Sequence, residues 1–219
     1  VIDSGLGPQI LEYIDLLTMA AMTASGDLDL GIPEEVKTSA LAYLVVVLEN
    51  SHDDRLEADL HALGMLLSDL GAMDAYVLPA GAATQLIEAR EKAFWLAKAS
   101  GANDVVDIVV PRATIPEFME AVQRIAGETA TWIAGCGHAG DGNVHLGVFQ
   151  ADPEVRTSVM MQLYRAGMDL GGAISGEHGI GTEKRGYYLE LEDPAKLELQ
   201  RRIKAAFDPN GILNPGAVF

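Results

Sequence analysis

A chain of 219 residues, 49% hydrophobic and 21% charged, has the composition of a globular protein and can bury one large core or two small ones. Its 15 Lys and Arg stand against 32 Asp and Glu, which gives a formal net charge of −17. This charge excludes a general nucleic-acid binder and argues against docking on anionic lipid, because both need a basic face. An anionic substrate would need a local cation to hold it against this field.

The single cysteine, Cys136, excludes an internal disulfide and favours a reducing compartment, so we expect a cytoplasmic location. The longest apolar run, residues 40–48, is far shorter than the roughly 20 residues of a membrane-spanning helix. We therefore expect no transmembrane segment, and leave open peripheral membrane association through partner subunits. Because the chain starts at Val1, we expect it to be a piece of a longer polypeptide.

The first half of the chain predicts alternating helices and strands. Apolar residues at Ile10, Leu11, Ile14 and Leu17 predict a helix after Pro8 that runs to about residue 24, followed by a Gly/Asp/Pro-rich connection over residues 26–33. The further predicted elements are a strand over 42–48, a helix over 54–70, a strand over 75–78 and a helix over 83–99 that ends at Gly101.

In the second half the same patterns predict strands over 105–110, 131–134 and 144–149, and helices over 115–126, 152–170 and 194–207. The strands are short and no glycine-rich phosphate turn follows the first one. We therefore predict an α+β fold with an antiparallel sheet, helices packed on it in ferredoxin-like split β-α-β units, and a helical C-terminal segment. The expected organisation is an N-terminal helix and connection (1–39), an α+β substrate-binding core (40–150) and the C-terminal segment (151–219).

Three of the five histidines lie in the two most glycine-dense segments of the chain, residues 135–145 and 175–186. His138 and His145 flank a Gly-Asp-Gly turn, and together with a distant Glu they supply the N,N,O ligands that borderline divalent metals accept. Such a set leaves coordination positions open, as a catalytic metal requires. The alternative is that both are hydrogen-bonded loop histidines beside a turn.

The second segment adds the pair Glu177-His178, which could place a metal-bound carboxylate beside a free imidazole acting as general base. A solvated polar turn is the alternative. Lys184 and Arg185 form a local basic pair that either is solvated or faces an anionic cofactor. His52 and His61 sit among acidic residues and are expected at the surface.

Arg90 lies four residues after Leu86 and four before Phe94, so it points with the apolar stripe of its predicted helix. A buried guanidinium needs a partner, which is either an internal carboxylate or a substrate carboxylate held bidentately. Cys136 is expected to be a small buried hydrophobe beside the histidine loop.

Three blocks in order, residues 138–145 (HAGDGNVH), 176–185 (GEHGIGTEKR) and 207–216 (FDPNGILNPG), resemble the C-terminal half of the FAD-linked 2-hydroxyacid oxidoreductases. This group includes the glycolate oxidase large subunit, D-lactate dehydrogenase and D-2-hydroxyglutarate dehydrogenase. Arg90 followed by the segment 107–111 resembles the substrate-domain part of the same group. The resemblance runs from about residue 40 to the end of the chain.

The resemblance implies a role for each matching residue. His138, His145 and Glu177 would hold a divalent metal, Zn or Mn/Fe, His178 would act as the base, and Arg90 would bind the substrate carboxylate. Asn143, Lys184 and Asn214 would lie toward the FAD. The implied fold is an antiparallel sheet with helices on one face.

The resemblance also implies that a flavin-binding domain, supplied in cis or in trans, holds most of the FAD, so this chain alone is expected to be inactive. Three positions depart from members that oxidise the dicarboxylate 2-hydroxyglutarate: Phe94, Val105 and Gly147 stand where a hydroxyl, a Lys and an Asn are expected.

The function expected from these features is the substrate- and metal-binding domain of a flavin-dependent dehydrogenase or oxidase for a small or apolar D-2-hydroxy acid. The alternatives are a flavin-dependent non-redox synthase of the same family, and a non-catalytic metal-binding or subunit-interaction module. Self-association into a homo-oligomer is left open.

Overall fold

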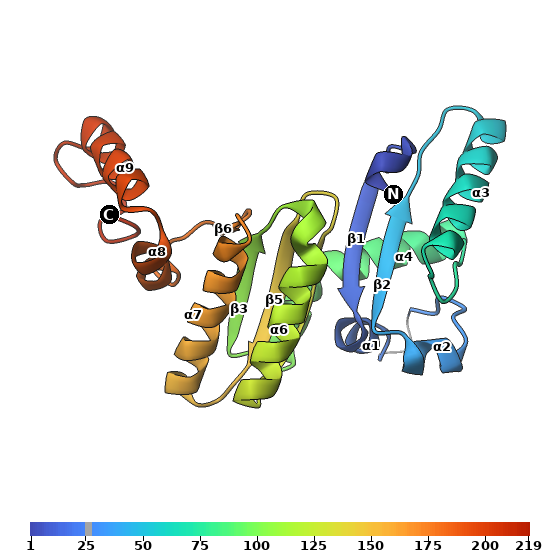
Figure 1. The fold of residues 1–219 in the computed structure, drawn as a ribbon, viewed down its shortest axis with the longest axis horizontal. Coiled ribbons are helices and arrows are strands. Elements are labelled where there is room, and N and C mark those ends of the chain that lie inside the picture. The colour runs from blue at the N-terminus through green and yellow to red at the C-terminus, as the bar shows by residue number, and fades with distance from the viewer. Residues whose placement is uncertain (25–27) are drawn as a thin grey trace.

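The computed structural model describes residues 1–24 and 28–219, and it is built around one six-stranded sheet with the strand order β2-β1-β4-β5-β3-β6 (Figure 1). The strands are β1 (Ile10–Asp15), β2 (Ala42–Val47), β3 (Asp104–Val109), β4 (Trp132–His138), β5 (Asn143–Phe149) and β6 (Ala173–Ile174). Neighbouring strands of this sheet pair antiparallel throughout, which confirms the predicted α+β class.

Helices fill the connections between these strands. The α-helices are α1 (Leu16–Thr23), α2 (Glu34–Ser39), α3 (Asp53–Asp69), α4 (Ala80–Glu91), α5 (Ala93–Ala99), α6 (Ile115–Thr129), α7 (Pro153–Asp169), α8 (Arg185–Leu191) and α9 (Pro194–Phe207). Two short 3₁₀ turns, η1 (Ile2–Ser4) and η2 (Arg112–Thr114), complete the order.

The segment from β3 to β6 forms a β-α-β-β-α-β unit, in the chain order β3-α6-β4-β5-α7-β6 and the sheet order β4-β5-β3-β6. This is the ferredoxin-like split β-α-β arrangement that the sequence predicts. The β1–β2 hairpin extends the sheet beyond β4, with which Tyr13 and Ile14 of β1 pair.

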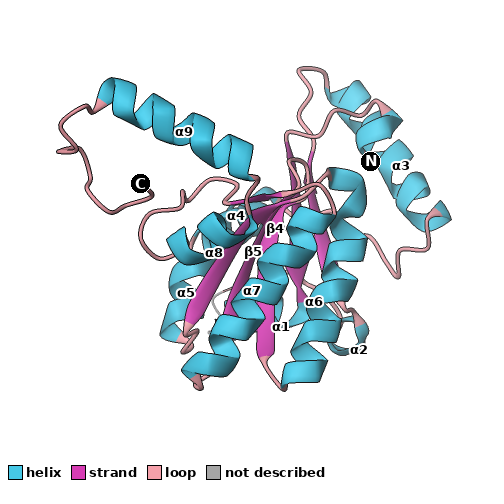
Figure 2. Cartoon of the chain, turned by 60° about the vertical axis from the view of Figure 1, so that its left-hand side comes forward, coloured by secondary structure: helices cyan, strands magenta, loops and turns pink. Residues whose placement is uncertain are grey.

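The larger core lies between this unit's sheet and the helices α6 and α7, which stand side by side over it in Figures 1 and 2. Side chains alternate between the two faces of a strand, so Val144, Leu146 and Val148 of β5 point into this core, while His145 and Gly147 point to the opposite face. The strand alternation therefore separates a packed face from a face that carries polar chemistry.

The opposite face also has a helix on it, because a side chain at Gly147 would meet Ala97 of α5. A second apolar cluster includes Ile14, Met19 of α1 and Cys136 of β4. Helices thus lie on both faces of the sheet, in contrast to the expectation of helices on one face. Between α1, α5 and β4 they leave the pocket described below.

Several predicted elements are confirmed within a few residues: β2, α3, β3, α6, β5, α7 and α9, whereas β4 runs on to His138 beyond the predicted 131–134. The helix expected from about residue 10 to 24 is confirmed over residues 16–23, which form α1, and is wrong over residues 10–15, which form β1 and pair with β2 along their whole length. The strand expected over 75–78 is absent from the described residues, where this stretch has no sheet partner. The helix expected over 83–99 is interrupted at Lys92, where a backbone bond to Ala89 tightens the last turn of α4.

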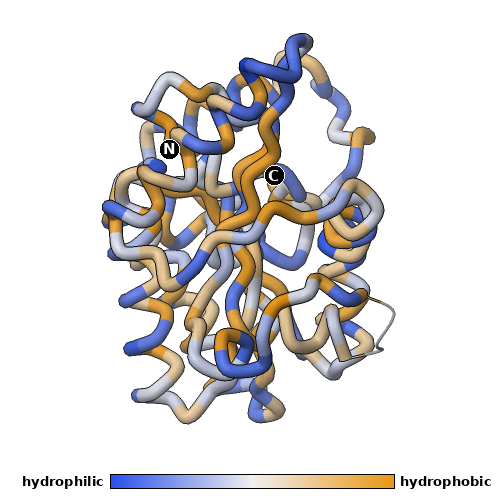
Figure 3. The backbone as a smooth tube through the Cα atoms, turned by 90° about the vertical axis from the view of Figure 1, so that its right-hand side faces the viewer, coloured by the Kyte–Doolittle hydropathy of each residue, from blue (hydrophilic) through white to orange (hydrophobic). Residues whose placement is uncertain are grey.

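The segments α2, β6 and α8 were not predicted from the sequence. Of the connection expected over residues 26–33, residues 28–33 contain no helix or strand, and residues 26–27 lie outside the described part of the chain. Figure 3, in which the β2 side of the molecule faces the viewer, shows a hydrophobic stretch through the centre and hydrophilic segments recurring along the outer helices and loops. None of the described helices is both long and apolar enough to cross a bilayer.

Candidate functional site

Three imidazoles and one carboxylate converge on the polar face of the sheet. His138 ends β4, His145 lies on β5, and Glu177 and His178 lie in the loop after β6. Glu177 Oε1 lies 3.0 Å from His145 Nε2, 3.4 Å from His178 Nε2 and 3.6 Å from His138 Nε2. The ligand atoms of His138, His145 and Glu177 all lie within 4.8 Å of one another, which is the spacing that a shared metal ion requires.

The tight turn between β4 and β5 brings the first two histidines together. His138 pairs with Asn143 across the hairpin, and the backbone N–H of Val110 donates to the carbonyl of Gly142 at 2.9 Å. Gly142 has a φ of +84°, and a Cβ there would lie 2.1 Å from the Val110 carbonyl oxygen. The turn therefore requires glycine at this position.

Asp107, fully buried on β3, holds the loop that carries Glu177 and His178. Its carboxylate accepts hydrogen bonds from Ser175 Oγ (2.7 Å), from the N–H groups of Gly176 (3.0 Å) and His178 (2.9 Å), and from Lys184 Nζ (3.1 Å). Burial opposes ionisation of Asp107, but the hydrogen bonds from Ser175 and His178 and the charge of Lys184 outweigh it, so its pKa is well below the ordinary value.

Arg90 pairs with an internal carboxylate, one of the two partners that the sequence left open. Its Nε donates to Glu12 Oε2 at 2.8 Å, and its Nη2 lies 2.7 Å from His138 Nε2. Glu12 Oε1 in turn lies 2.8 Å from His138 Nδ1. The Glu12 side chain is buried on β1, so this carboxylate fixes both Arg90 and His138 beside the cluster.

The donor types of this set, two imidazoles and one carboxylate, are those that borderline divalent metals accept. Two buried atoms beside the set, Asn143 Oδ1 and His145 Nδ1, find no hydrogen-bond partner among the residues that the structure describes. Burial is the main cause that lowers the pKa of His145 to about 4, against the opposing charge of Asp107. The neutral imidazole that results is the form that binds a metal.

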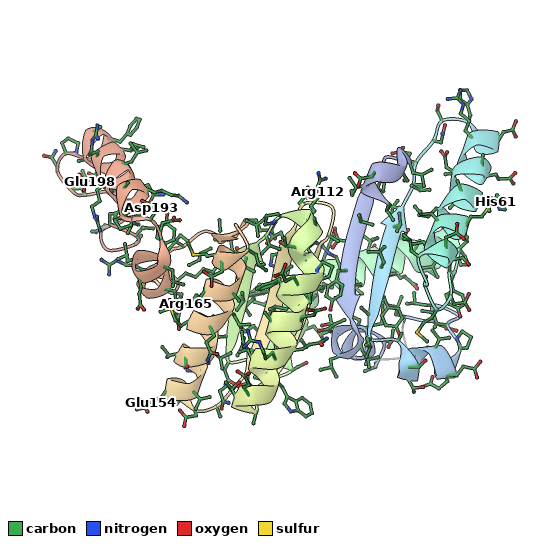
Figure 4. All side chains as sticks on the ribbon, in the orientation of Figure 1. His61, Arg112, Glu154, Arg165, Asp193 and Glu198 are labelled. Atoms are coloured by element: carbon green, nitrogen blue, oxygen red, sulfur yellow. The ribbon has the colours of Figure 1, made fainter. Side chains whose placement is uncertain are left out.

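The remaining predicted residues are placed as follows. Lys184 is largely buried and bound to Asp107, whereas Asn214 lies in the exposed turn after α9 with a φ of +45° and does not join the cluster. Cys136 is buried, and desolvation raises its pKa to about 11, as expected of a small hydrophobe. His52 and His61 are exposed, and Figure 4 shows His61 on α3, on the outer side of the molecule.

Sequence reasoning missed the roles of Glu12, Asp107 and Ser175. Asp107 has a visible signal, an acidic residue inside the otherwise apolar strand 105–110. Glu12 has none, because the segment that contains it was assigned to a helix. Ser175 has a φ of +68°, rare for a residue with a side chain, and its hydrogen bond to Asp107 holds it there.

A pocket of about 400 Å³ opens beside the cluster. Arg90, the three histidines and Glu177 line one end of it. Most of the other lining residues are apolar and come from α1, α5, β4 and β5, among them Leu17, Ala21, Phe94, Ala97, Ala134 and Phe149.

The fold and the site define a class of protein. The family model of the FAD linked oxidases, C-terminal domain, matches residues 1–218, and the chain belongs to this family. It is 55% identical over its whole length to an uncharacterized FAD-linked oxidoreductase of Mycobacterium tuberculosis, of which it covers 48%.

Two further relatives have named activities. The chain is 31% identical to a D-lactate dehydrogenase of Anaerostipes hadrus, matching 97% of this chain and 46% of that protein. It is 30% identical to the glycolate oxidase subunit GlcD of Bacillus subtilis, matching 100% of this chain and 47% of that protein. The chain thus spans about half the length of the curated relatives it matches.

Among solved structures, the 4-ethylphenol oxidase of Gulosibacter chungangensis superposes with a TM-score of 0.57 at 17% identity, over 95% of this chain and 47% of that one. This likeness shows a shared fold.

Proposed function

We propose that this chain is the substrate- and metal-binding part of a flavin-dependent D-2-hydroxyacid dehydrogenase or oxidase. The observation that carries the proposal is the position of Glu177 Oε1, between 3.0 and 3.6 Å from the Nε2 atoms of His138, His145 and His178. The names of the D-lactate dehydrogenase and glycolate oxidase relatives support the substrate class.

In this proposal His138, His145 and Glu177 hold a divalent ion, for which the donor types and spacing are suitable. When bound, the ion supplies positive charge beside the substrate oxygen, and the flavin supplies the acceptor for the hydride that leaves the hydroxyl-bearing carbon. The oxidation of a 2-hydroxy acid to a 2-oxo acid would need the ion, the flavin and the side chains that this chain provides.

His178 is the proposed acceptor of the hydroxyl proton at Nε2. Its side chain is 40% exposed on the pocket, and its backbone N–H is fixed by Asp107. The ring of Phe94 lies edge-on to it, with the ring centroids 6.3 Å apart. A general base must reach the proton that it accepts, and the position of His178 in the pocket lining supports this role.

Arg90 is the proposed partner of the substrate carboxylate. Its Nε is bound to Glu12, but its Nη1 has no hydrogen bond within the described part of the chain and can donate to the substrate. Arg90 is also the one Lys or Arg among the described residues that line the pocket. It therefore supplies the local cation that an anionic substrate needs in a chain of net charge −17.

The test uses the flavin-loaded full-length protein that contains this chain. Under anaerobic conditions, D-2-hydroxy acids should bleach the flavin, and His178→Ala should slow bleaching at least about 100-fold. His61→Ala is the matched control, because His61 is exposed on α3, and it should leave the rate unchanged. If the flavin of His178→Ala bleaches at a near-normal rate, His178 is not the base. A flavin that stays yellow with every 2-hydroxy acid would overturn the proposed reaction.

The metal is tested separately by elemental analysis of the purified protein. We expect about one divalent ion per chain, and its loss in His145→Ala. A metal-free wild-type protein that does not take up Zn²⁺ or Mn²⁺ would contradict the ligand assignment.

A further inference from the structure

We propose, on the basis of the proposed function, that the pocket selects a 2-hydroxy acid monoanion whose side chain is apolar and larger than methyl, either branched aliphatic or benzyl. The structure favours this substrate class over glycolate, lactate and dicarboxylates. Three features of the pocket support the inference: the residue pairs of β4 and β5 that form its floor, the side chains that form its walls, and the charges in its lining.

The floor of the pocket changes from polar to apolar along β4 and β5. Three cross-strand pairs face it in succession: Cys136 with His145, Ala134 with Gly147, and Trp132 with Phe149. Because a strand rises about 3.4 Å per residue, the second row lies about 7 Å from the histidine and the third about 14 Å. A substrate held at the histidines would therefore extend its side chain along an apolar floor.

The middle row carries the smallest side chains of the floor. Its members are Ala134 and Gly147, the smallest residues available, and Val105 of β3 continues the same row at the other side of Gly147. Beyond the middle row, the aromatic side chains of Trp132 and Phe149 form the far end. This geometry suits an apolar side chain that extends from the histidines over the middle row.

The walls are apolar as well. Leu17 and Ala21 of α1 line one side, and Phe94 and Ala97 of α5 line the other. A methyl or hydrogen substituent would leave most of this surface without a partner. A larger apolar substituent removes this apolar surface from water, and binding becomes stronger in proportion to the apolar area that is buried.

The charges of the pocket exclude a second carboxylate. Arg90 is already paired with Glu12, and Glu91 and Glu177 add negative charge to the lining. Lys184 is bound to Asp107 and does not line the pocket. A second carboxylate on the substrate would lie on the apolar floor with no cation to compensate its desolvation.

The test compares anaerobic flavin reduction by D-lactate, D-2-hydroxy-4-methylpentanoate, D-3-phenyllactate and D-2-hydroxyglutarate in the flavin-loaded full-length protein. We expect kcat/KM for the two larger apolar acids to exceed that for D-lactate at least about tenfold, because added carbons enter an apolar pocket. D-2-Hydroxyglutarate should be poorer than D-2-hydroxy-4-methylpentanoate.

The variant Ala134→Leu fills the middle row and should lower kcat/KM for D-2-hydroxy-4-methylpentanoate about tenfold, chiefly by raising KM, and should lower the ratio of this value to that for D-lactate. Ala42→Leu is the matched control, because Ala42 is exposed on β2 and lies outside the pocket. A second measurement does not depend on a folded variant: 4-methylpentanoate should inhibit the wild-type protein at least about tenfold more strongly than propanoate.

The outcomes separate this inference from the function on which it rests. Flavin reduction by D-lactate as fast as or faster than by the larger acids would overturn the inference and leave the proposed reaction standing. Equal inhibition by propanoate and 4-methylpentanoate would also overturn it. A flavin that no 2-hydroxy acid reduces would overturn the proposed function, and this inference with it.

Discussion

Within the described part of the chain, the buried carboxylate of Asp107 accepts hydrogen bonds only from residues of the segment 175–184. Glu177 and His178 are exposed loop residues without regular structure, and this side chain holds them relative to His145, together with the backbone pairing of β6 with β3 just before the loop. At the scale of single residues, Asp107 is therefore a positioning residue for the cluster rather than a member of the reacting set. The hydrogen bonds from backbone N–H groups explain why an acid is required there.

Asp107→Asn should lower the free energy of unfolding by about 3 kcal/mol, because it removes charged hydrogen bonds and leaves Lys184 without its partner. The pKa of Asp107 is lowered in the fold, so its contribution is complete above the unfolded-state value of about 3.9 and fades as the pH falls below it. Urea unfolding at pH 7 and pH 3 measures both effects, and the difference between wild type and variant should shrink at pH 3.

The control is Asp104→Asn on the same strand, where the side chain is only half-buried and accepts a bond from its neighbour Val105. This change should stay within about 0.5 kcal/mol of wild type. A loss of less than about 1 kcal/mol for Asp107→Asn would mean that the loop is held by something other than this carboxylate.

At the scale of elements, the sequence predicts those helices and strands whose hydrophobic pattern matches the face that they bury. β5, α6 and α7 each bury one face in the core, so the period of their apolar residues is enough to identify them. The histidine hairpin was also visible, because glycine residues mark the turn between two short apolar runs. The convergence of His138, His145 and Glu177 then depends on register, which places His145 opposite both Cys136 and Asp107.

The N-terminal segment shows why the rest could not be predicted. Residues 10–15 have apolar positions compatible with one face of a helix, but they form β1 because β2, about 30 residues further along the chain, offers a complete ladder of backbone partners. A partner so far away in sequence leaves no local pattern. The wrong helix also concealed Glu12, and with it the ion pair that determines what Arg90 contacts.

Two glycines on different elements should respond oppositely to alanine. Gly142→Ala should destabilise the protein by more than about 1 kcal/mol, because its φ of +84° and the Val110 carbonyl leave no room for a Cβ. Gly64→Ala, within α3 and with nothing near its Cβ position, should stabilise by up to about 1 kcal/mol. Chemical unfolding measures both; a neutral Gly142→Ala would show that the turn can adopt another conformation.

At the scale of the whole molecule, the two faces of the sheet have different roles. One face is buried under α6 and α7 and stabilises the fold, whereas the other presents the histidines, Asp107 and the pocket. A net charge of −17 disfavours an anionic substrate but favours a divalent cation. The overall charge would therefore favour the proposed cation at this site, whereas the proposed anionic substrate would need positive charge that is supplied locally.

A divalent ion that binds the folded chain, but not the unfolded one, must raise its stability. At a free metal concentration 100 times Kd the gain is about 2.7 kcal/mol, which for a chain of this length corresponds to a rise in Tm of roughly 5–10 °C. Calorimetry of the metal-stripped protein with and without Zn²⁺ or Mn²⁺ measures it. His145→Ala should abolish the rise and His52→Ala, an exposed histidine, should retain it. Because the protein's field attracts the cation, the rise should also shrink between about 10 and 300 mM NaCl. A Tm that rises equally in His145→Ala would show that the ion binds the acidic surface elsewhere.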